Sequence, residues 1–352
     1  MTHNCARRFL VSMVFLVIAP VASVLAQDNA AWTEPFPPFR IAGNLYYVGS
    51  KGLANYLITT TQGHILINSD LEANVPLIRA SVEKLGFKFT DIKILLISHA
   101  HWDHNAASAM IKKLTGASYM VMDADVANVE SGGKTDFHYG NDPGNLYPAT
   151  KVDRALHDGD QVKLGDAVLV AHLTPGHTKG CTTWTMKVGD SGRTYDAVIV
   201  GSPNVNAGYK LVNNAAYPAI ASDYERMFTV LKSLPADIFL GAHGSYFDME
   251  AKYARMKPGA PNPVRRSRRL QAVRDAEGAG VSRGVHETEV SRVQRILSGS
   301  PDTISTSFFP CANAYRLPSC ARSTKARPSA FAPDDDRIIG SSVSGRWSSR
   351  DA

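Results

Sequence analysis

The 352-residue sequence predicts an α/β protein in which helices cover β-sheets. Between residues 44 and 241, short apolar segments alternate with segments whose apolar residues recur at helical spacing. Hydrophobic residues make up 44% and charged residues 20% of the chain, which is ordinary for a globular protein and indicates no function. Periodicity alone leaves two architectures open, a Rossmann-type layer and a four-layer αββα sandwich.

The individual elements follow from local patterns. Apolar runs predict buried strands at residues 64–68, 92–97, 167–171, 197–200 and 237–240. One helix is predicted over residues 75–85, with Pro76 in its first turn and Gly86 as its stop. Further helices are predicted over residues 106–114, before Gly116, and over residues 223–234.

The first 26 residues are typical of a secretory signal peptide. Arg7 and Arg8 precede an apolar run over residues 9–24, and small residues come shortly before Gln27. The alternative is an N-terminal membrane anchor, but the run is short for a spanning helix. No later stretch is long and apolar enough to cross a bilayer. We therefore expect a periplasmic protein with no membrane partner.

Residues 264–352 differ in composition from the rest of the chain. They hold 14 Arg, one Lys and 15 Ser without sustained periodicity. Their basic and acidic residues number 15 and 9, whereas residues 1–263 hold 23 of each, so this tail carries the whole net charge of +6. We therefore expect no nucleic-acid partner for the folded body. Two interpretations of the tail remain open: a natural disordered segment, and the product of a reading-frame change near Pro263.

A dense group of metal-binding residue types follows the predicted strand at residues 92–97. His99 and His101 are two residues apart, so in extended chain they point to the same side. Asp103 and His104 follow as the chain turns into a helix, where both can face back toward the same point. Burying these four side chains without a metal would leave polar atoms poorly paired. The spacing predicts a site for two adjacent divalent metals.

Two further histidines lie in loops at predicted strand ends. His177 stands in a Thr-Pro-Gly-His-Thr-Lys-Gly segment, and His243 in a Gly-Ala-His-Gly segment. Glycine and proline allow tight turns close to a ligand. Imidazole and carboxylate donors without thiolate favour zinc, with iron or manganese as lesser alternatives.

The pattern His-x-His-x-Asp-His, followed by Pro-Gly-His-Thr and a late His, resembles the metallo-β-lactamase superfamily. The resemblance covers about residues 40–263 and implies that residues 27–263 form one domain, a four-layer αββα sandwich with the metals at one edge of the sheets. It also implies two Zn²⁺ per chain, the first held by His99, His101 and His177 and the second by Asp103, His104 and His243.

The position after the strand at residues 197–200 separates branches of this superfamily. Thioesterase-like and lactonase members usually carry there an aspartate that bridges both metals, and two other β-lactamase subclasses carry a cysteine ligand. This chain has Ser202, which is similar to subclass B3 and implies that Ser202 and Asn204 bind the substrate carboxylate. Asn204 stands where members often have Ser or Thr, and Ser202 is alternatively an ordinary turn residue.

The resemblance implies hydrolysis of the β-lactam amide bond in penicillins, cephalosporins and carbapenems, and thus antibiotic resistance. A hydroxide shared by the two metals would attack the carbonyl carbon, because metal binding lowers the pKa of water. Asp103 would hold the second metal, orient the hydroxide and pass a proton to the leaving nitrogen. Asp70 either orients a ligand histidine or caps a turn.

Two other functions remain open from the sequence. The same metals could serve a thioesterase or lactonase of the glyoxalase II kind, against which Ser202 argues. A non-enzymatic periplasmic metal-binding protein is the other alternative. We expect a monomer whose partner is a small-molecule β-lactam.

Overall fold

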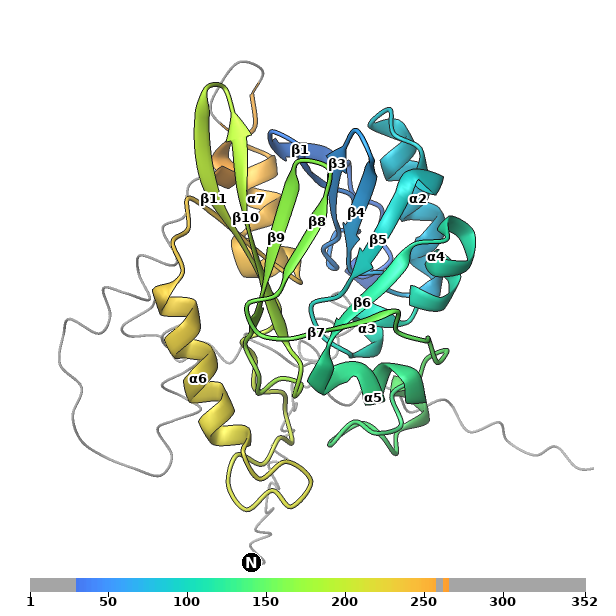
Figure 1. Cartoon of the computed structure of the whole chain (residues 1–352), viewed down its shortest axis with the longest axis vertical. Coiled ribbons are helices and arrows are strands. Elements are labelled where there is room, and N and C mark those ends of the chain that lie inside the picture. Colours follow the sequence, from blue (N-terminus) through green and yellow to red (C-terminus); the bar gives the residue numbers. More distant parts are fainter. Residues whose placement is uncertain (1–29, 258–261, 266–352) are drawn as a thin grey trace, which may run out of the picture. The chain divides into compact units, whose positions relative to one another are not determined.

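The computed structural model describes residues 30–257 and 262–265 (Figure 1). The predicted signal peptide, residues 1–26, lies outside this range, and so does the predicted tail beyond Arg265. In the described part, Val264 is fully buried in the central core. None of the helices in the described part has the length and apolar character needed to cross a bilayer.

The first sheet has seven strands arranged in the order of the chain. Its first four strands pair antiparallel, and its last four pair parallel, so that the fourth strand has one neighbour of each kind. The strands are β1 (Phe39–Ala42), β2 (Leu45–Tyr47), β3 (Tyr56–Thr60), β4 (Gly63–Ile67), β5 (Ile92–Leu96), β6 (Ser118–Met122) and β7 (Arg154–Leu156).

The second sheet has five strands in the order β12-β11-β10-β9-β8. Its neighbours pair antiparallel except β11 and β12, which are parallel. The strands are β8 (Gln161–Leu164), β9 (Ala167–Leu173), β10 (Thr182–Asp190), β11 (Arg193–Val200) and β12 (Ile238–Gly241).

Helices cover the outer face of each sheet, so the chain forms four layers, as expected for an αββα sandwich. In Figure 1, α2 and α4 lie beside the first sheet and α6 lies along the second. Separate apolar clusters join α2 and α4 to the first sheet and α6 to β11. The helices are α2 (Val75–Lys84), α3 (Trp102–Asn105), α4 (Ser108–Thr115), α5 (Asp123–Ser131), α6 (Ile220–Ser233) and α7 (Met249–Tyr253). Short 3₁₀ turns cover Glu72–Asn74, Phe89–Asp91, Pro143–Asn145, Gly244–Phe247 and Pro263–Arg265.

The largest apolar cluster lies between the two sheets. It takes the inward side chains of both sheets, including Ile58, Ile65 and Ile199, all at most 1% exposed. Trp184 of β10 is also buried there, and its Nε1 donates a hydrogen bond to the carbonyl of Ile97 at 3.0 Å. This bond joins the second sheet to the chain just after β5, where the metal-binding motif begins.

The elements predicted from apolar runs are present, with small shifts of their ends. Gly86 and Gly116 have positive φ angles of 88° and 68°, which explains why the chain leaves the helical path at these glycines. The helix expected over residues 106–114 covers Ser108–Thr115, and the one expected over residues 223–234 covers Ile220–Ser233. Seven strands were not predicted, namely β1, β2, β3, β6, β7, β8 and β10, because many are short or carry polar residues on one face.

Candidate metal centre

Four of the predicted ligands come from one short stretch after β5. His101 is extended, with φ −85° and ψ 154°, and directly precedes α3, which carries Asp103 and His104. His99 is 1% exposed, His101 and Asp103 are each 7% exposed, and His104 is fully buried. The turn from strand end into helix therefore brings all four side chains into the interior.

The remaining two histidines are positioned by glycine-containing turns. His177 lies between β9 and β10, after Gly176, whose φ is 128°. A Cβ at Gly176 would lie 2.8 Å from the Tyr224 ring, so a larger residue would displace this loop. His243 follows β12 and forms an isolated β-bridge with Leu53, which lies in the segment between β2 and β3.

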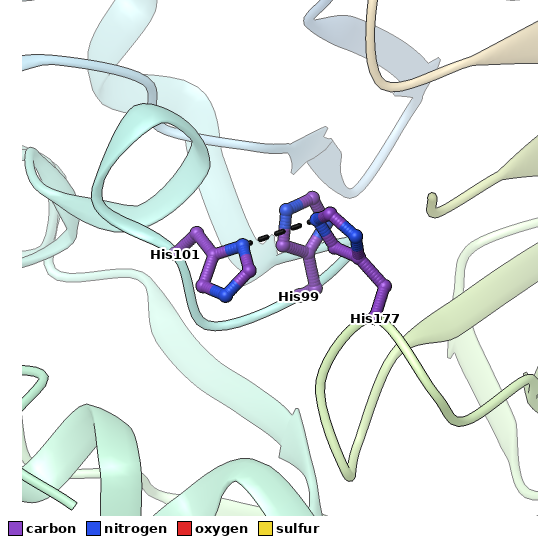
Figure 2. A group of neighbouring side chains, drawn as sticks. All are labelled: His99, His101 and His177. Carbon is purple, nitrogen blue, oxygen red and sulfur yellow. Dashed lines mark hydrogen bonds between the residues drawn. The ribbon is translucent and has the colours of Figure 1, made fainter. Parts of the chain in front are cut away.

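His99, His101 and His177 form the first cluster (Figure 2). Their potential ligand atoms all lie within 4.8 Å of one another. His101 Nδ1 and His177 Nε2 are 3.1 Å apart. The loop after β5 and the loop between β9 and β10 thus present three imidazoles to one point.

Asp103, His104 and His243 form the second cluster. The Nε2 atoms of His104 and His243 are 3.1 Å apart, and Asp103 Oδ2 lies 3.2 Å from the first and 3.6 Å from the second. The His99 ring centroid lies 4.5 Å from that of His104 and 4.6 Å from that of His177. The two clusters are therefore contiguous, and the structure brings all six predicted ligands together.

Polar partners on the far side of two imidazoles orient them. His177 Nδ1 lies 2.8 Å from the carbonyl oxygen of Asn204. A carbonyl oxygen only accepts, so Nδ1 carries the hydrogen and the neutral ring presents a lone pair from Nε2 to the cluster. His101 Nε2 lies 3.5 Å from Asp136 Oδ2, which leaves Nδ1 facing His177. Such outer partners fix the orientation of metal-binding histidines.

Burial and mutual proximity set the charge of these side chains. Burial lowers the pKa of His99 and His177 well below the ordinary value, and neighbouring histidines lower it further. Burial and the adjacent His104 lower the pKa of His243 to about 3. Burial alone would raise the pKa of Asp103, but interaction with His104 brings it below its usual range. Neutral imidazoles and an ionised carboxylate are the forms that bind metal ions.

The donor set fits a divalent cation. Imidazole nitrogens and a carboxylate without thiolate are donors that zinc accepts in proteins. With the tautomers assigned above, the lone pairs of His101 Nδ1 and His177 Nε2 face each other at 3.1 Å, and a shared cation would relieve this arrangement. His104 faces the second cluster with Nε2, and its buried Nδ1 has no hydrogen-bond partner among the described residues.

The predicted substrate-binding residues share a contact with the Tyr246 hydroxyl. Ser202 Oγ is 3.1 Å from the Tyr246 hydroxyl, to which the Asn204 side-chain amide also donates. The Tyr246 ring centroid lies 5.0 Å from that of His243, whereas the Asn204 carbonyl accepts from His177. Ser202 and Asn204 are 1% and 7% exposed, so both side chains are buried.

Asp70 is buried beneath the second cluster, in the loop after β4. Its Oδ2 accepts a hydrogen bond from Asn74 at 3.5 Å, and its Oδ1 has no hydrogen-bond partner among the described residues. Burial raises the pKa of Asp70 to about 7, although His104 opposes this effect. The carboxyl group is therefore close enough to His104 to interact with it electrostatically, but no hydrogen bond joins them in the described part of the chain.

Several residues near the clusters were not predicted from the sequence. Asp136 approaches His101, and the Tyr209 hydroxyl donates to the carbonyl of His177 at 2.9 Å. Asp125 accepts hydrogen bonds from the loops that carry the first cluster. Neither aspartate has ligand spacing in the sequence, so only the fold shows that these residues adjoin the site.

Comparisons with known proteins agree with this geometry. A family model described as the metallo-beta-lactamase superfamily matches residues 54–243. The native FEZ-1 metallo-beta-lactamase from Legionella gormanii is 56% identical, with a TM-score of 0.65, over 70% of this chain and 98% of that one. BJP-1, a subclass B3 metallo-beta-lactamase of Bradyrhizobium japonicum, is 42% identical, with a TM-score of 0.63, over 66% and 88% of the two chains.

Two more relatives extend the comparison. LRA-12, a class B3 di-zinc metallo-beta-lactamase from an Alaskan soil metagenome, is 38% identical, with a TM-score of 0.65, over 77% of this chain and 96% of that one. A probable metallo-hydrolase of Burkholderia pseudomallei (strain 1710b) is 32% identical over 107 residues, which is 30% of this chain and 34% of that protein, so the match spans about a third of that relative. The chain belongs to the metallo-β-lactamase superfamily of hydrolases, and its structural neighbours place it with subclass B3.

Proposed function

We propose that this chain is a zinc-dependent β-lactamase that hydrolyses the amide bond of penicillins, cephalosporins and carbapenems and so confers antibiotic resistance. The observation that carries the proposal is the convergence of five imidazoles and one carboxylate in two contiguous clusters, in which all but His243 are buried. Identity of 56% to a named metallo-beta-lactamase supports the substrate class.

Each cluster would hold one zinc ion, the first through His99, His101 and His177 and the second through Asp103, His104 and His243. When bound, the pair of cations would supply Lewis acidity and lower the pKa of water to about 7. The pKa shifts of His99, His177, His243 and Asp103 favour the metal-binding protonation state of these four side chains.

Asp103 is the proposed catalytic residue. Its Oδ2 faces both His104 and His243, so the carboxylate stands within the second cluster and can accept a hydrogen bond from the attacking water there. Because its pKa is low, it stays ionised near neutrality and can orient that water. The proton that this water gives up as it attacks the carbonyl carbon can pass along the hydrogen bond at Asp103 to the lactam nitrogen as the amide bond breaks.

Ser202 and Asn204 are the proposed anchors of the substrate carboxylate. Both side chains meet at the Tyr246 hydroxyl, which donates or accepts according to its rotation. A bound carboxylate would compete for the Ser202 hydroxyl and the Asn204 amide, both of which can donate to it. Asp70 is proposed to help orient His104, whose backbone carbonyl accepts a hydrogen bond from the N–H of the adjacent Ser69 at 3.0 Å.

The test combines metal analysis with turnover of two substrate classes. Purified protein is assayed on a carbapenem and on a thioester, each with and without a chelator, while zinc is measured per chain. We expect two zinc ions per chain and carbapenem hydrolysis that the chelator abolishes. Thioester turnover without carbapenem turnover would instead identify a thioesterase, and zinc binding without either would identify a binding protein.

We further propose export to the periplasm with removal of residues 1–26, and a monomeric mature protein. Mass spectrometry of the periplasmic fraction would show a new N-terminus at Gln27, and light scattering would give the mass of one chain. An N-terminus at Met1, or a dimer mass, would refute the corresponding statement.

A further inference from the structure

We infer that Asp125 is a positioning residue: its carboxylate holds together, through hydrogen bonds, the loop after β5 and the loop between β9 and β10, which carry the first metal cluster. This inference rests on the proposed metal site and adds a residue that no ligand motif contains. Asp125 lies in the first turn of α5, directly after β6, and is 2% exposed. Its side chain binds the neighbouring loops.

One carboxylate oxygen reaches both loops at once. Asp125 Oδ2 accepts from the backbone N–H of Ala100 at 3.1 Å and from the Thr178 hydroxyl at 2.7 Å. Ala100 stands between His99 and His101, and Thr178 directly follows His177. A single atom thus joins the chain segments that present all three imidazoles of the first cluster.

The second carboxylate oxygen binds the loop between β9 and β10 at another point. Asp125 Oδ1 accepts from the backbone N–H of Gly180 at 2.8 Å. A Cβ at Gly180 would lie 2.6 to 2.7 Å from atoms of Asp125, so only glycine permits this approach. A backbone hydrogen bond from Thr182 to Ser98 at 2.7 Å also joins the two loops, but at their strand ends rather than beside the histidines.

The chemistry of the donors requires a carboxylate at this position. Each oxygen of Asp125 accepts from a backbone N–H, one from Ala100 and the other from Gly180. An asparagine would present its NH₂ group to one of these two donors in either orientation, leaving a buried donor without an acceptor. Asp125→Asn therefore preserves the shape of the side chain but removes the hydrogen bond from the backbone N–H of either Ala100 or Gly180.

Holding the loops together fixes the distance between His101 and His177. Their facing nitrogens are 3.1 Å apart, although the residues are 76 positions apart in sequence. Ala100 is held from its other side as well, because its carbonyl accepts from the Tyr147 hydroxyl at 2.7 Å. The hydrogen bonds to Asp125 hold the three histidines of the first cluster in place before metal binds, so that binding requires less ordering of these loops.

The experiment measures zinc affinity by competition with a chromophoric chelator, alongside amide hydrogen exchange in the metal-free protein. In Asp125→Asn we expect a loss of first-site zinc affinity of about 10- to 100-fold, with the second site unchanged. Exchange of the Ala100 and Gly180 amides should accelerate. Asp190→Asn is the matched control, because Asp190 is another buried carboxylate, bound to Arg40 and Gly43.

A second pair of variants keeps the test valid if Asp125→Asn does not fold. Thr178→Val removes one donor and should lower first-site affinity about 2- to 10-fold, whereas Thr178→Ser should retain it. Wild-type zinc affinity and unchanged exchange in both Asp125→Asn and Thr178→Val would overturn the inference. Absence of zinc binding by the wild-type protein would instead overturn the proposed function, and the exchange rates would still decide whether Asp125 holds the loops.

Discussion

Replacing Asp70 with asparagine should stabilise the metal-free protein near neutral pH. Asp70 is fully buried, and burial raises its pKa from the ordinary value of 3.8 to about 7. The folded state therefore holds the proton more tightly than the unfolded state, so the wild-type protein loses stability as pH rises from about 4 to about 7. Asparagine removes this loss and tolerates the positive φ of 56° at this position.

The magnitude follows from the two pKa values. Their separation corresponds to a cost of about 4 kcal/mol once the pH exceeds 7. The new amide is expected to offset about 1–3 kcal/mol of the gain, because its NH₂ group is an added buried donor that the wild-type carboxyl group does not have. This offset is independent of pH. The difference between variant and wild type should therefore grow by about 2–3 kcal/mol between pH 5 and pH 8.

The assay is urea unfolding of both proteins at several pH values in the presence of a chelator. Asp166→Asn on the turn between β8 and β9 is the control, because Asp166 is exposed and should change the free energy of unfolding by less than about 0.5 kcal/mol. A constant difference between Asp70→Asn and wild type across this pH range would refute the reasoning. With zinc bound the advantage should shrink or reverse, since a nearby cation favours the ionised carboxylate.

Three further predictions test the site and the fold. His104→Ala should reduce bound zinc from about two ions to one per chain and lower carbapenem turnover at least about tenfold, as measured by metal analysis and steady-state kinetics; unchanged zinc content would contradict the proposed ligand set. Ile199→Ala, between the sheets, should lower the free energy of unfolding measured in urea by about 2–5 kcal/mol. The control Val212→Ala, at a side chain that is 68% exposed, should change it by less than about 0.5 kcal/mol. Equal effects of the two substitutions would refute the position of the core. Gly176→Ala should weaken zinc binding, because its Cβ would press on the Tyr224 ring, and a chelator competition giving wild-type affinity would show that the loop accommodates the change.

Local chemistry explains which parts of the fold were predictable. The apolar runs at β4, β5, β11 and β12 are largely buried because their side chains match a buried, pleated surface wherever it lies in the protein. The run at β9 also forms a strand, but only one of its faces is buried, and Val168 on the other face is exposed, so the expectation of a fully buried strand was wrong there. Strand β10 was not predicted from a continuous apolar run, because its later residues alternate between buried and exposed. The alternation of elements predicted sheets covered by helices, but the choice of two facing sheets came from the resemblance carried by the motif and was confirmed by the fold.

The sequence by itself determined the donor chemistry of this protein, because the identity and close spacing of His99, His101, Asp103 and His104 are local properties. Only the tertiary structure decided which distant residues complete the site. His243 meets His104 from 139 positions away, and Asp125 binds the first-cluster loops, because packing of the two sheets brings their strand ends together. Contacts of this kind depend on the burial of the whole inter-sheet core, which no local pattern encodes.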